Sequence, residues 1–529
     1  MKTISRRVFL RSTAVSAAAY SFLGSQTSRT LARGKKTTKV SDAAAKLGKD
    51  DRRPNVVFVL ADDFGYGSLN CTGADPALVR TPNIDRLARE GIKFTQASTN
   101  VSLCSPCRYS LMTGEYPWRE GGLTYGVVEL NAPLLLKTDR RSLANVFQDN
   151  GYQTAMIGKW HLGYGTKQTT PETFSKDLNP GPLEVGFDYH FGVPHNHGAM
   201  PNVYVENHSV YGIRSDKVSP YSRSFYGVEY WGIDAPQRVD ENIEQDLTDK
   251  AIDWLRQCDR EKPFFMYFAA TAIHHPITPS PYMRGMSDCG PYGDFVQDLD
   301  HSVGQLFQAL EYMGVADNTL FIFAGDNGGD PGPANGPGRR AMAAGFDINA
   351  PFKGHKHTIW EGGHRVPFIA RWPGFIPQSS SSDAIVSMND VFATLAELVE
   401  GQPPQGDVAP DSFSFLEAML KPDGASGTGR KSIINGNHGG MLAIRRGSWK
   451  YIEGKYPEAT PKNRRIPDNI TRPQLYNLDN DIKEEKNVIE QFPEIAEKLQ
   501  LELDAIRAGS SERELMKNKG AAFNLPEFN

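Results

Sequence analysis

The chain reads NVVFVLADDFGYG over residues 55–67, and this stretch decides the fold class. Residues 55–60 are dominated by apolar side chains, which is typical of a parallel strand buried on both faces of a sheet. The strand ends in two acids, Asp62 and Asp63, at the position where open α/β sheets bind ligands. Adjacent carboxylates repel each other unless a cation is bound, but a capped turn explains the pair equally well. The stretch therefore predicts a central strand and leaves a metal site open.

A second stretch of the same kind, TLFIFAGDNGG at residues 319–329, favours the metal site. It also ends in oxygen donors, Asp326 and Asn327, followed by glycines that let the backbone approach a ligand closely. Together with Asp62 and Asp63 these side chains offer only oxygen donors. Such a set favours a hard cation, with Ca²⁺ as the first choice and Mg²⁺ as the second.

Two further apolar segments lead into basic side chains. The segment AMIGKWHLG at residues 155–163 places Lys159 and His161 two residues apart, so that they share a face if the backbone is extended. The segment PFFMYFAA at residues 263–270 leads to His274 and His275. Taken singly, a surface lysine and a capping histidine are the commoner interpretations of such residues.

The segment LCSPCRYSLMTG at residues 103–114 predicts a short helix. Proline is favoured at the first helical position and glycine just beyond the last one, so the helix should run from near Pro106 to Gly114. Ser105 is then placed to cap the free amides at its start.

This helix carries a candidate nucleophile. Cys104 would lie just outside the helix start, at the positive end of the dipole, where thiol pKa values are lowered. Arg108 would return to the same face one turn later. Cys104 and Cys107 also have the Cys-x-x-Cys spacing of redox and zinc sites, which on spacing alone is about as good an interpretation, but no second pair completes four sulfur ligands.

These segments together resemble the type I sulfatases of the alkaline phosphatase superfamily, whose signature is Cys-x-Pro-Ser-Arg followed by Thr-Gly. The resemblance covers nearly the whole chain from about Asn55 onward, with Cys107 standing where the family usually has Ser, Thr or Ala. In that family a maturation enzyme oxidises the cysteine to formylglycine, whose hydrated aldehyde is the nucleophile. The resemblance implies this modification at Cys104, which would bind Ca²⁺ together with the four oxygen donors. A Cys104–Cys107 disulfide would compete with it.

The resemblance also implies roles for the basic residues. The block Gly-Lys-Trp-His matches residues 158–161, and the block His-x-Pro assigns the active position to His274, with the neighbouring His275 as the alternative assignment. Lys159 and Lys356 would neutralise the sulfate, His274 would protonate the departing alcohol oxygen, and His161 would take the proton from the second hydroxyl.

Arg108 is expected to orient the nucleophile. Lys356 belongs to the segment GHKHTIWEGGHRVP at residues 354–367, which is similar to the family block Gly-x-Lys…Glu-Gly-Gly-x-Arg-x-Pro. Within it, Glu361 and Arg365 are predicted to form a structural ion pair. The remaining histidines of this segment, including His364, are expected at the rim or the surface.

Substrate contacts are expected in the loop-like stretch His190–Val210, with His195, His197 and Asn202, and at His438, although each is also ordinary loop chemistry. By analogy with exported sulfatases, the substrate would be a sulfated poly- or oligosaccharide. A broad-specificity arylsulfatase, a phosphate or phosphonate ester hydrolase of the same superfamily, and a binder of sulfated glycans remain alternatives.

Composition argues against some classes of partner, and the N-terminal segment predicts where the protein acts. The 529 residues carry a net charge of -4, so a nucleic-acid partner is not supported, and the five cysteines form no disulfide framework. The run SRRVFLR at residues 5–11, followed by a short apolar run, reads as a twin-arginine signal peptide. It predicts export by the twin-arginine machinery to the bacterial periplasm or medium, without a stable membrane anchor.

The alternation of strands and helices predicts an α/β fold with a large mixed, mainly parallel sheet covered by helices on both faces. We expect a signal peptide at residues 1–32, a linker at 33–53, and a catalytic domain at 54–435. A smaller C-terminal α+β subdomain at 436–529 should contain a small antiparallel sheet and a helix from about Pro493 to Ile506.

Overall fold

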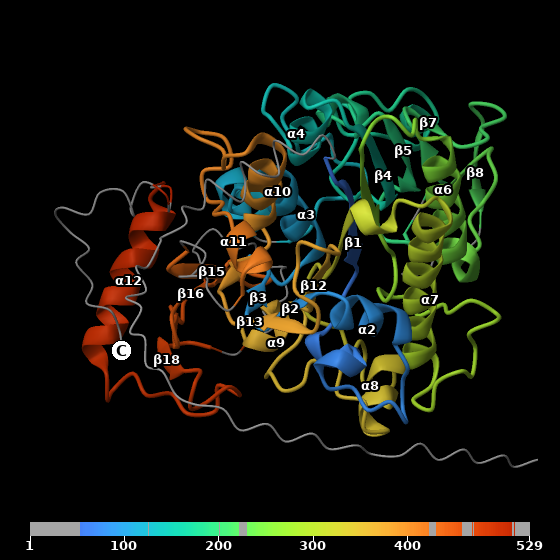
Figure 1. Ribbon diagram of the computed structural model, residues 1–529. Coiled ribbons are helices and arrows are strands. Elements are labelled where there is room, and N and C mark those ends of the chain that lie inside the picture. Colours follow the sequence, from blue (N-terminus) through green and yellow to red (C-terminus); the bar gives the residue numbers. More distant parts are fainter. Residues whose placement is uncertain are drawn as a thin grey trace, which may run out of the picture. The chain divides into compact units, whose positions relative to one another are not determined.

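The computed structural model describes residues 53–124, 126–199, 201–221, 230–422, 430–456, 468, 470–509, 511 and 513. The predicted signal peptide and almost all of the predicted linker lie outside these residues. The main feature is a ten-stranded sheet with the order β13-β2-β12-β11-β1-β10-β4-β5-β6-β7. Figure 1 labels several of its strands, among them β1, β4 and β5. In chain order its strands are β1 (Asn55–Ala61), β2 (Ile92–Phe94), β4 (Gln153–Lys159), β5 (Tyr189–Val193), β6 (Val205–Glu206), β7 (Ser209–Val210), β10 (Phe264–Ala269), β11 (Thr319–Gly325), β12 (Phe368–Arg371) and β13 (Ser380–Ser382).

The centre of this sheet is parallel. Strand β1 pairs in parallel with both β10 and β11, β10 with β4, and β4 with β5. Antiparallel pairs involve β12 on one side and β6 and β7 on the other. The predicted large mixed, mainly parallel sheet is therefore confirmed. The prediction of a loop over residues 190–210 is wrong at both ends. His190 lies in β5, and residues 205–210 contain the two short edge strands β6 and β7.

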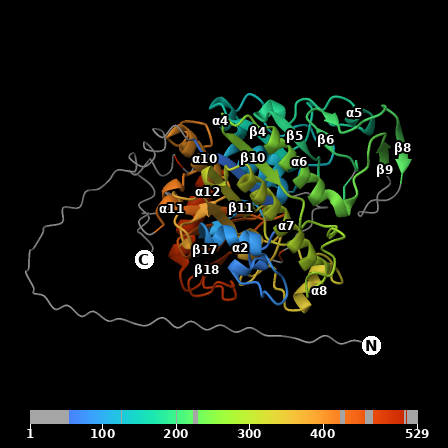
Figure 2. The same cartoon turned by 45° about the vertical axis from the view of Figure 1, so that its right-hand side comes forward.

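Strand β1 is buried on both faces, as its apolar run predicts. Val56, Phe58 and Leu60 belong to one core cluster, and the alternate residues Val57 and Val59 belong to another. The first cluster also contains side chains of α3 (Cys104–Thr113), α4 (Leu143–Asp149), α10 (Asp390–Glu400) and α11 (Leu416–Leu420). The second contains side chains of α2 (Pro82–Arg89), α6 (Ile243–Gln257) and α7 (Pro291–Tyr312). Helices thus cover both faces of the sheet (Figure 2).

Shorter elements complete this part of the chain. The helices are α5 (Pro171–Phe174), α8 (Pro337–Ala343) and α9 (Glu361–His364), and the 3₁₀ turns are η1 (Tyr66–Ser68), η2 (Asn70–Thr72), η3 (Pro117–Thr124), η4 (Leu183–Val185), η5 (Asp240–Asn242) and η6 (Ala316–Asn318). Two separate strand pairs are β3 (Ala97–Ser98) with β14 (Val386–Ser387), and β8 (Val218–Tyr221) with β9 (Tyr230–Ile233). Within the described residues, no helix has the length and apolar character needed to cross a membrane.

The C-terminal region has the small antiparallel sheet and the helix predicted for it. The strands β15 (Ser432–Gly436), β16 (Leu442–Arg446), β17 (Trp449–Ile452) and β18 (Gln474–Asn477) pair in sequence order. Helix α12 (Pro493–Arg507) packs Leu499, Leu503 and Ile506 against apolar side chains of this sheet. The first strand of this sheet, β15, begins at Ser432, before the predicted boundary at residue 436. The division into two domains at residue 436 stays a prediction.

A buried ion-pair network joins this small sheet to the segment around α9. Lys450 on β17 is fully buried, with its Nζ 3.1 Å from Glu361 Oε1 and 2.8 Å from Glu484 Oε1. Arg365 also pairs with Glu361, which confirms the structural ion pair expected there. The two carboxylates thus share the charge of one buried lysine. Such a network is strongly destabilised when one partner is removed, because the remaining charges stay buried.

Replacing Lys450 by methionine should therefore lower the free energy of unfolding by about 3–5 kcal/mol. Methionine keeps much of the volume of the side chain but leaves Glu484 without its cation. Urea unfolding followed by tryptophan fluorescence measures the change, with the exposed Lys431→Met as the matched control. A loss no larger than that of the control would contradict the assigned role of the network.

Candidate active site

Four neighbouring parallel strands bring the candidate residues to one edge of the sheet. Asp62 and Asp63 follow β1, and Asp326 and Asn327 follow β11. Lys159 ends β4, and His274 lies a few residues after β10. Because β11, β1, β10 and β4 are adjacent and parallel, their carboxyl ends meet at the same edge. The sequence-predicted convergence of these side chains is thus reproduced by the topology.

Helix α3 begins at Cys104, two residues earlier than predicted. Its N-cap residue is Leu103, which is extended and makes no side-chain cap, and Ser105 instead accepts a hydrogen bond from the Val128 amide. The cause is tertiary, because the preceding Ser102 amide donates to the Gly436 carbonyl at the end of β15 and holds the chain extended up to the helix. The predicted end is confirmed, since Gly114 has φ 67° and donates to the Ser110 carbonyl.

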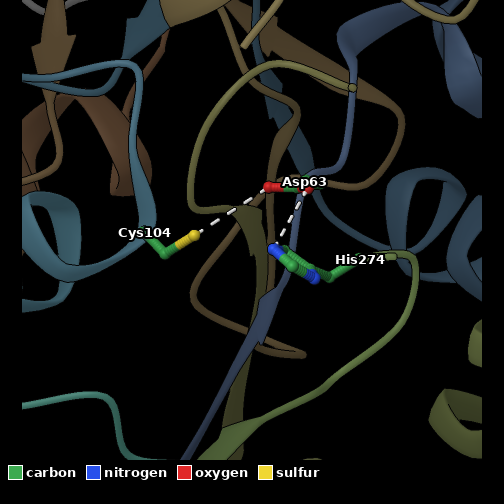
Figure 3. A group of neighbouring side chains, drawn as sticks. All are labelled: Asp63, Cys104 and His274. Atoms are coloured by element: carbon green, nitrogen blue, oxygen red, sulfur yellow. Dashed lines mark hydrogen bonds and ion pairs between the residues drawn. The ribbon is translucent and has the colours of Figure 1, made fainter. Parts of the chain in front are cut away.

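Cys104 lies in the first turn of α3, with 1% of its surface exposed. Its Sγ is 4.0 Å from Asp63 Oδ1 (Figure 3). Burial raises the pKa of the thiol to about 12, although the positive charges of Lys159 and Lys356 act in the opposite direction. The prediction that the helix dipole lowers the pKa of the Cys104 thiol is therefore wrong, because desolvation raises this pKa by more than nearby positive charge lowers it. All five cysteines lie in the described part of the chain as free thiols, so Cys104 and Cys107 form no disulfide.

Three buried carboxylates at the site each face a buried cation. Lys159 Nζ is 2.5 Å from Asp62 Oδ2, and Lys356 Nζ is 2.6 Å from Asp63 Oδ1. Arg108 Nη2 is 2.9 Å from Asp326 Oδ2, and its Nη1 donates to the Lys159 carbonyl at 2.8 Å. The guanidinium therefore braces the acidic cluster.

The charges in this cluster are not balanced at every carboxylate. Burial raises the pKa of Asp62, but the positive charges of Lys159, His274 and Arg108 outweigh burial and hold this pKa below its usual range. Burial, followed by the negative charge of Asp62, raises the pKa of Asp326 to about 7. A further positive charge at this place would allow all three acids to remain ionised.

The donor set fits a hard cation. Asp62 Oδ1 and Asn327 Oδ1 are buried and have no hydrogen-bond partner among the residues that the structure describes. The amide of Asn327 is oriented by its Nδ2, which donates to Asp63 Oδ1 at 2.9 Å and leaves the oxygen available. Ligand atoms of Asp62, Cys104 and Asp326 lie within 4.8 Å of one another, as do those of Asp63, Cys104 and His274. These free oxygens in a buried acidic cluster are what a Ca²⁺ site requires.

The two histidines expected to transfer protons, His274 and His161, are placed at the site by different backbone segments. His274 donates from Nδ1 to the His275 carbonyl at 2.6 Å, and its Nε2 is 3.8 Å from Asp63 Oδ2 (Figure 3). His161 follows the end of β4 and has φ 55°, so the backbone from Lys159 to His161 is not extended. The prediction that these two side chains share one face of a strand is therefore wrong. The left-handed turn nevertheless keeps the His161 ring close to the site. Burial, followed by neighbouring positive charge, lowers the pKa of both rings.

The predicted substrate residues occupy three different settings. The His195 ring packs 3.9 Å from the His161 ring and donates to the Val128 carbonyl at 3.0 Å. His197 is buried, donates to the Pro276 carbonyl at 2.7 Å, and lies 6.1 Å from the His274 ring. His438 is half-buried, with its Nδ1 3.2 Å from His357 Nδ1. Both His195 and His197 are thus walls of the site, whereas His438 lies beside His357.

Two other predicted positions and one unpredicted acid complete the description. Asn202 donates to the Arg238 carbonyl at 2.9 Å and serves the loop itself. His364 was expected at the rim but is fully buried, where it faces the Thr99 carbonyl at 3.3 Å. Sequence reasoning missed Asp330. Burial raises its pKa, but the charges of Lys356, His357 and His275 together lower it below its usual value. The available signal was a further acid four residues after Asp326.

Comparisons with known proteins agree with this site. A model of the sulfatase family matches residues 54–401. The N-acetylgalactosamine-6-O-sulfatase of Bacteroides thetaiotaomicron is 33% identical over 499 residues, which span 87% of this chain and 94% of that protein. Human N-acetylgalactosamine-6-sulfatase is 33% identical over 375 residues, spanning 70% of this chain and 66% of the human protein.

A solved structure gives the same result at the level of the fold. It comes from work on the metabolism of multiple glycosaminoglycans by Bacteroides thetaiotaomicron, and it shares 33% identity with this chain at a TM-score of 0.77. The likeness covers 86% of this chain and 100% of that one. With its family match, its relatives and its fold in agreement, the chain belongs to the sulfatase family.

Proposed function

We propose that this sulfatase removes the 6-O-sulfate of N-acetylgalactosamine from a glycosaminoglycan-type oligo- or polysaccharide. The observation that carries the proposal is the 33% identity to N-acetylgalactosamine-6-O-sulfatase across 94% of that relative. The gathering of Cys104, three buried acids and two buried lysines at one sheet edge supports the same chemistry.

The nucleophile is proposed to be formylglycine made from Cys104 by a maturation enzyme. A thiol whose pKa is raised to about 12 is protonated at neutral pH, and a protonated thiol is a poor nucleophile. Formylglycine in its hydrated form supplies a hydroxyl group that can attack sulfur. Arg108 then serves mainly as a structural support, since its Nη2 contacts Asp326 and Asp62 and its Nη1 donates to the Lys159 carbonyl.

The remaining residues handle charge and protons. Lys159 and Lys356 bring two buried positive charges to the position of the sulfate oxygens. His274 gives a proton to the departing sugar oxygen, and His161 takes one from the nucleophile in the second half of the reaction. Asp62, Asp63, Asp326 and Asn327 would hold Ca²⁺, which would add positive charge near the transition state.

The mass of the proteolytic peptide that contains Cys104 tests this proposal. The protein should be made in its native host or beside a maturation enzyme, and we expect an aldehyde in place of the thiol. The modified protein should release sulfate from 6-O-sulfated N-acetylgalactosamine and leave the 4-O-sulfated isomer intact. An intact thiol, or a peptide lighter by two hydrogen atoms, would favour a phosphate or phosphonate ester hydrolase instead.

Removing calcium should abolish turnover and lower the melting temperature. Without the cation the buried acids repel each other, and Ca²⁺ at 100 times its Kd adds about 2.7 kcal/mol to the free energy of unfolding. Calorimetry of chelator-treated protein, titrated with Ca²⁺ or Mg²⁺, measures this effect independently of activity. Asp326→Asn is the matched variant, since it keeps the shape but loses a charge and should respond less to Ca²⁺. A wild-type melting temperature that does not respond to Ca²⁺ would contradict the site.

We also propose that residues 1–32 direct export to the periplasm or the medium, so that Cys104 is modified before the folded chain leaves the cell. Cell fractionation of the native host tests this. The mature protein should be found outside the cytosol, and its exclusive presence in the cytosol would contradict the export proposal.

A further inference from the structure

We propose that Glu244 is a positioning residue for His274. It fixes the backbone segment that delivers the histidine, and through that segment it sets the rate at which the departing sugar oxygen is protonated. This inference rests on the proposed function, in which His274 is the proton donor.

Glu244 lies in the first turn of α6, on the face of the helix turned toward the sheet, with 3% of its surface exposed. Its Oε1 accepts three hydrogen bonds from two consecutive residues. The donors are the Thr271 amide at 2.6 Å, the Thr271 hydroxyl at 2.7 Å and the Ala272 amide at 2.5 Å. One carboxylate oxygen therefore holds the chain at the point where it leaves β10.

The other side of this segment is held by the backbone of Asp62. The Asp62 amide donates to the Ala272 carbonyl at 3.0 Å, and the Ile273 amide donates to the Asp62 carbonyl at 2.7 Å. His274 comes next and donates from its amide to the Thr271 carbonyl at 3.1 Å. The residues just before His274 are thus clamped between Glu244 and the end of β1.

This clamp depends on an oxygen acceptor rather than on an ion pair. Among the described residues no lysine or arginine is a main electrostatic influence on Glu244, and the nearby charge of Asp298 is also negative. Burial, reinforced by that charge, raises the pKa of Glu244 to about 7, while the three donors act against it. Glu244 Oε2 has no hydrogen-bond partner in the described residues. A glutamine can therefore replace Glu244, because its carbonyl accepts the same three bonds.

Losing the acceptor should move His274 rather than unfold the sheet. Two buried amides and a hydroxyl would need new partners, because each buried donor left unpaired carries a free-energy cost. The segment relieves that cost by shifting, and a shift of about 1 Å at a reacting group lowers a rate by about 100-fold. Asp62 directly follows the paired strand β1 and is held in addition by Lys159, so its position is less sensitive.

The experiment compares two substrates in Glu244→Ala and Glu244→Gln. One substrate is 6-O-sulfated N-acetylgalactosamine, whose sugar oxygen needs protonation, and the other is 4-nitrophenyl sulfate, whose leaving group does not. We expect Glu244→Ala to lower kcat on the sugar by about 10–100-fold and on the aryl ester by about 3-fold or less, with KM little changed. Glu244→Gln should restore kcat on both.

Asp298→Ala is the matched control. Asp298 is also a buried acid on a helix, and it accepts from the Ser280 amide at 2.8 Å and the Ser280 hydroxyl at 2.9 Å, farther along the same chain segment. Its loss should affect stability and both substrates alike. If Glu244→Ala does not fold, Thr271→Val removes one of the three bonds and should give a smaller loss confined to the sugar.

A double-mutant cycle with His274→Ala separates the two proposals. If Glu244 acts through His274, then Glu244→Ala should cost little more on the sugar once His274 is absent. If the losses in kcat of Glu244→Ala and His274→Ala simply multiply in the double variant, the positioning role of Glu244 is overturned, even if His274 proves to be the proton donor. If His274→Ala instead harms both substrates equally, the proton-donor role fails, and non-additive losses would still support positioning by Glu244. The positioning role would also be overturned if Glu244→Ala and Thr271→Val lowered kcat equally on both substrates and showed no coupling to His274→Ala.

Discussion

Replacing Cys104 by alanine should lower kcat on the sulfated sugar by about 10⁴-fold or more. The proposed nucleophile exists only if this side chain is oxidised, and alanine provides neither a thiol nor an aldehyde. Because Cys104 is small, its removal from the first turn of α3 should cost only about 1 kcal/mol of unfolding free energy. Steady-state kinetics and thermal unfolding together measure both effects.

Two neighbouring variants make this result specific. Cys107→Ser changes another fully buried thiol of α3 and introduces a residue that the family usually has there, so it should keep turnover within a few-fold of wild type. Cys104→Ser supplies a hydroxyl at the site without the aldehyde and should be nearly as inactive as alanine. Full activity in Cys104→Ser would show that formylglycine is not needed.

The central sheet could be predicted from sequence because its signal is local and strong. Residues 55–60, 263–270 and 319–324 are dominated by apolar side chains, and each forms a strand buried in the middle of the sheet. The polar residues that follow them had to meet, since parallel neighbours end at the same edge. The position of Asp62, Asp63, Asp326 and Asn327 therefore followed from strand order alone.

The surroundings of the nucleophile could not be predicted in this way. The start of α3 is set by a hydrogen bond from Ser102 to Gly436, more than 300 residues away in sequence, and local capping signals gave a later start. The pKa of Cys104 depends on how deeply the thiol is buried, which the sequence does not show. His161 lies near the site through a left-handed turn that strand periodicity does not anticipate.

Residues that act through others left no sequence signal at all. Glu244 holds Thr271 and Ala272 from a helix, and Lys450 serves Glu361 from another sheet. Both are ordinary charged residues within amphipathic or alternating segments, where an exposed position is the usual expectation. His197 was chosen for a substrate contact, whereas its ring supports the Pro276 carbonyl beside His274. Burial, which decides each of these cases, is known only from the fold.

Replacing His274 by alanine should separate sugar sulfates from aryl sulfates. A sugar alkoxide is a strong base and leaves poorly unless it is protonated, so we expect kcat on 6-O-sulfated N-acetylgalactosamine to fall by about 10²–10⁴-fold. A nitrophenolate leaves without a proton, and kcat on 4-nitrophenyl sulfate should fall by about 10-fold or less. Nε2 is the nitrogen that faces the site, because Nδ1 is used by the His275 carbonyl. Burial, together with the charges of Lys356 and Lys159, lowers the pKa of this ring, so the protonated ring is a strong acid toward a sugar alkoxide.

His275→Ala tests the competing assignment. His275 is also buried and precedes the same proline, so a general disturbance of this segment should appear in both variants. We expect His275→Ala to change the two substrates by similar factors, because the ring of His274 would still face Asp63. Selective loss of the sugar in His275→Ala, with little loss in His274→Ala, would transfer the proton-donor role to His275. Equal losses on both substrates in His274→Ala would instead mean that the ring binds the sulfate rather than protonating the leaving group.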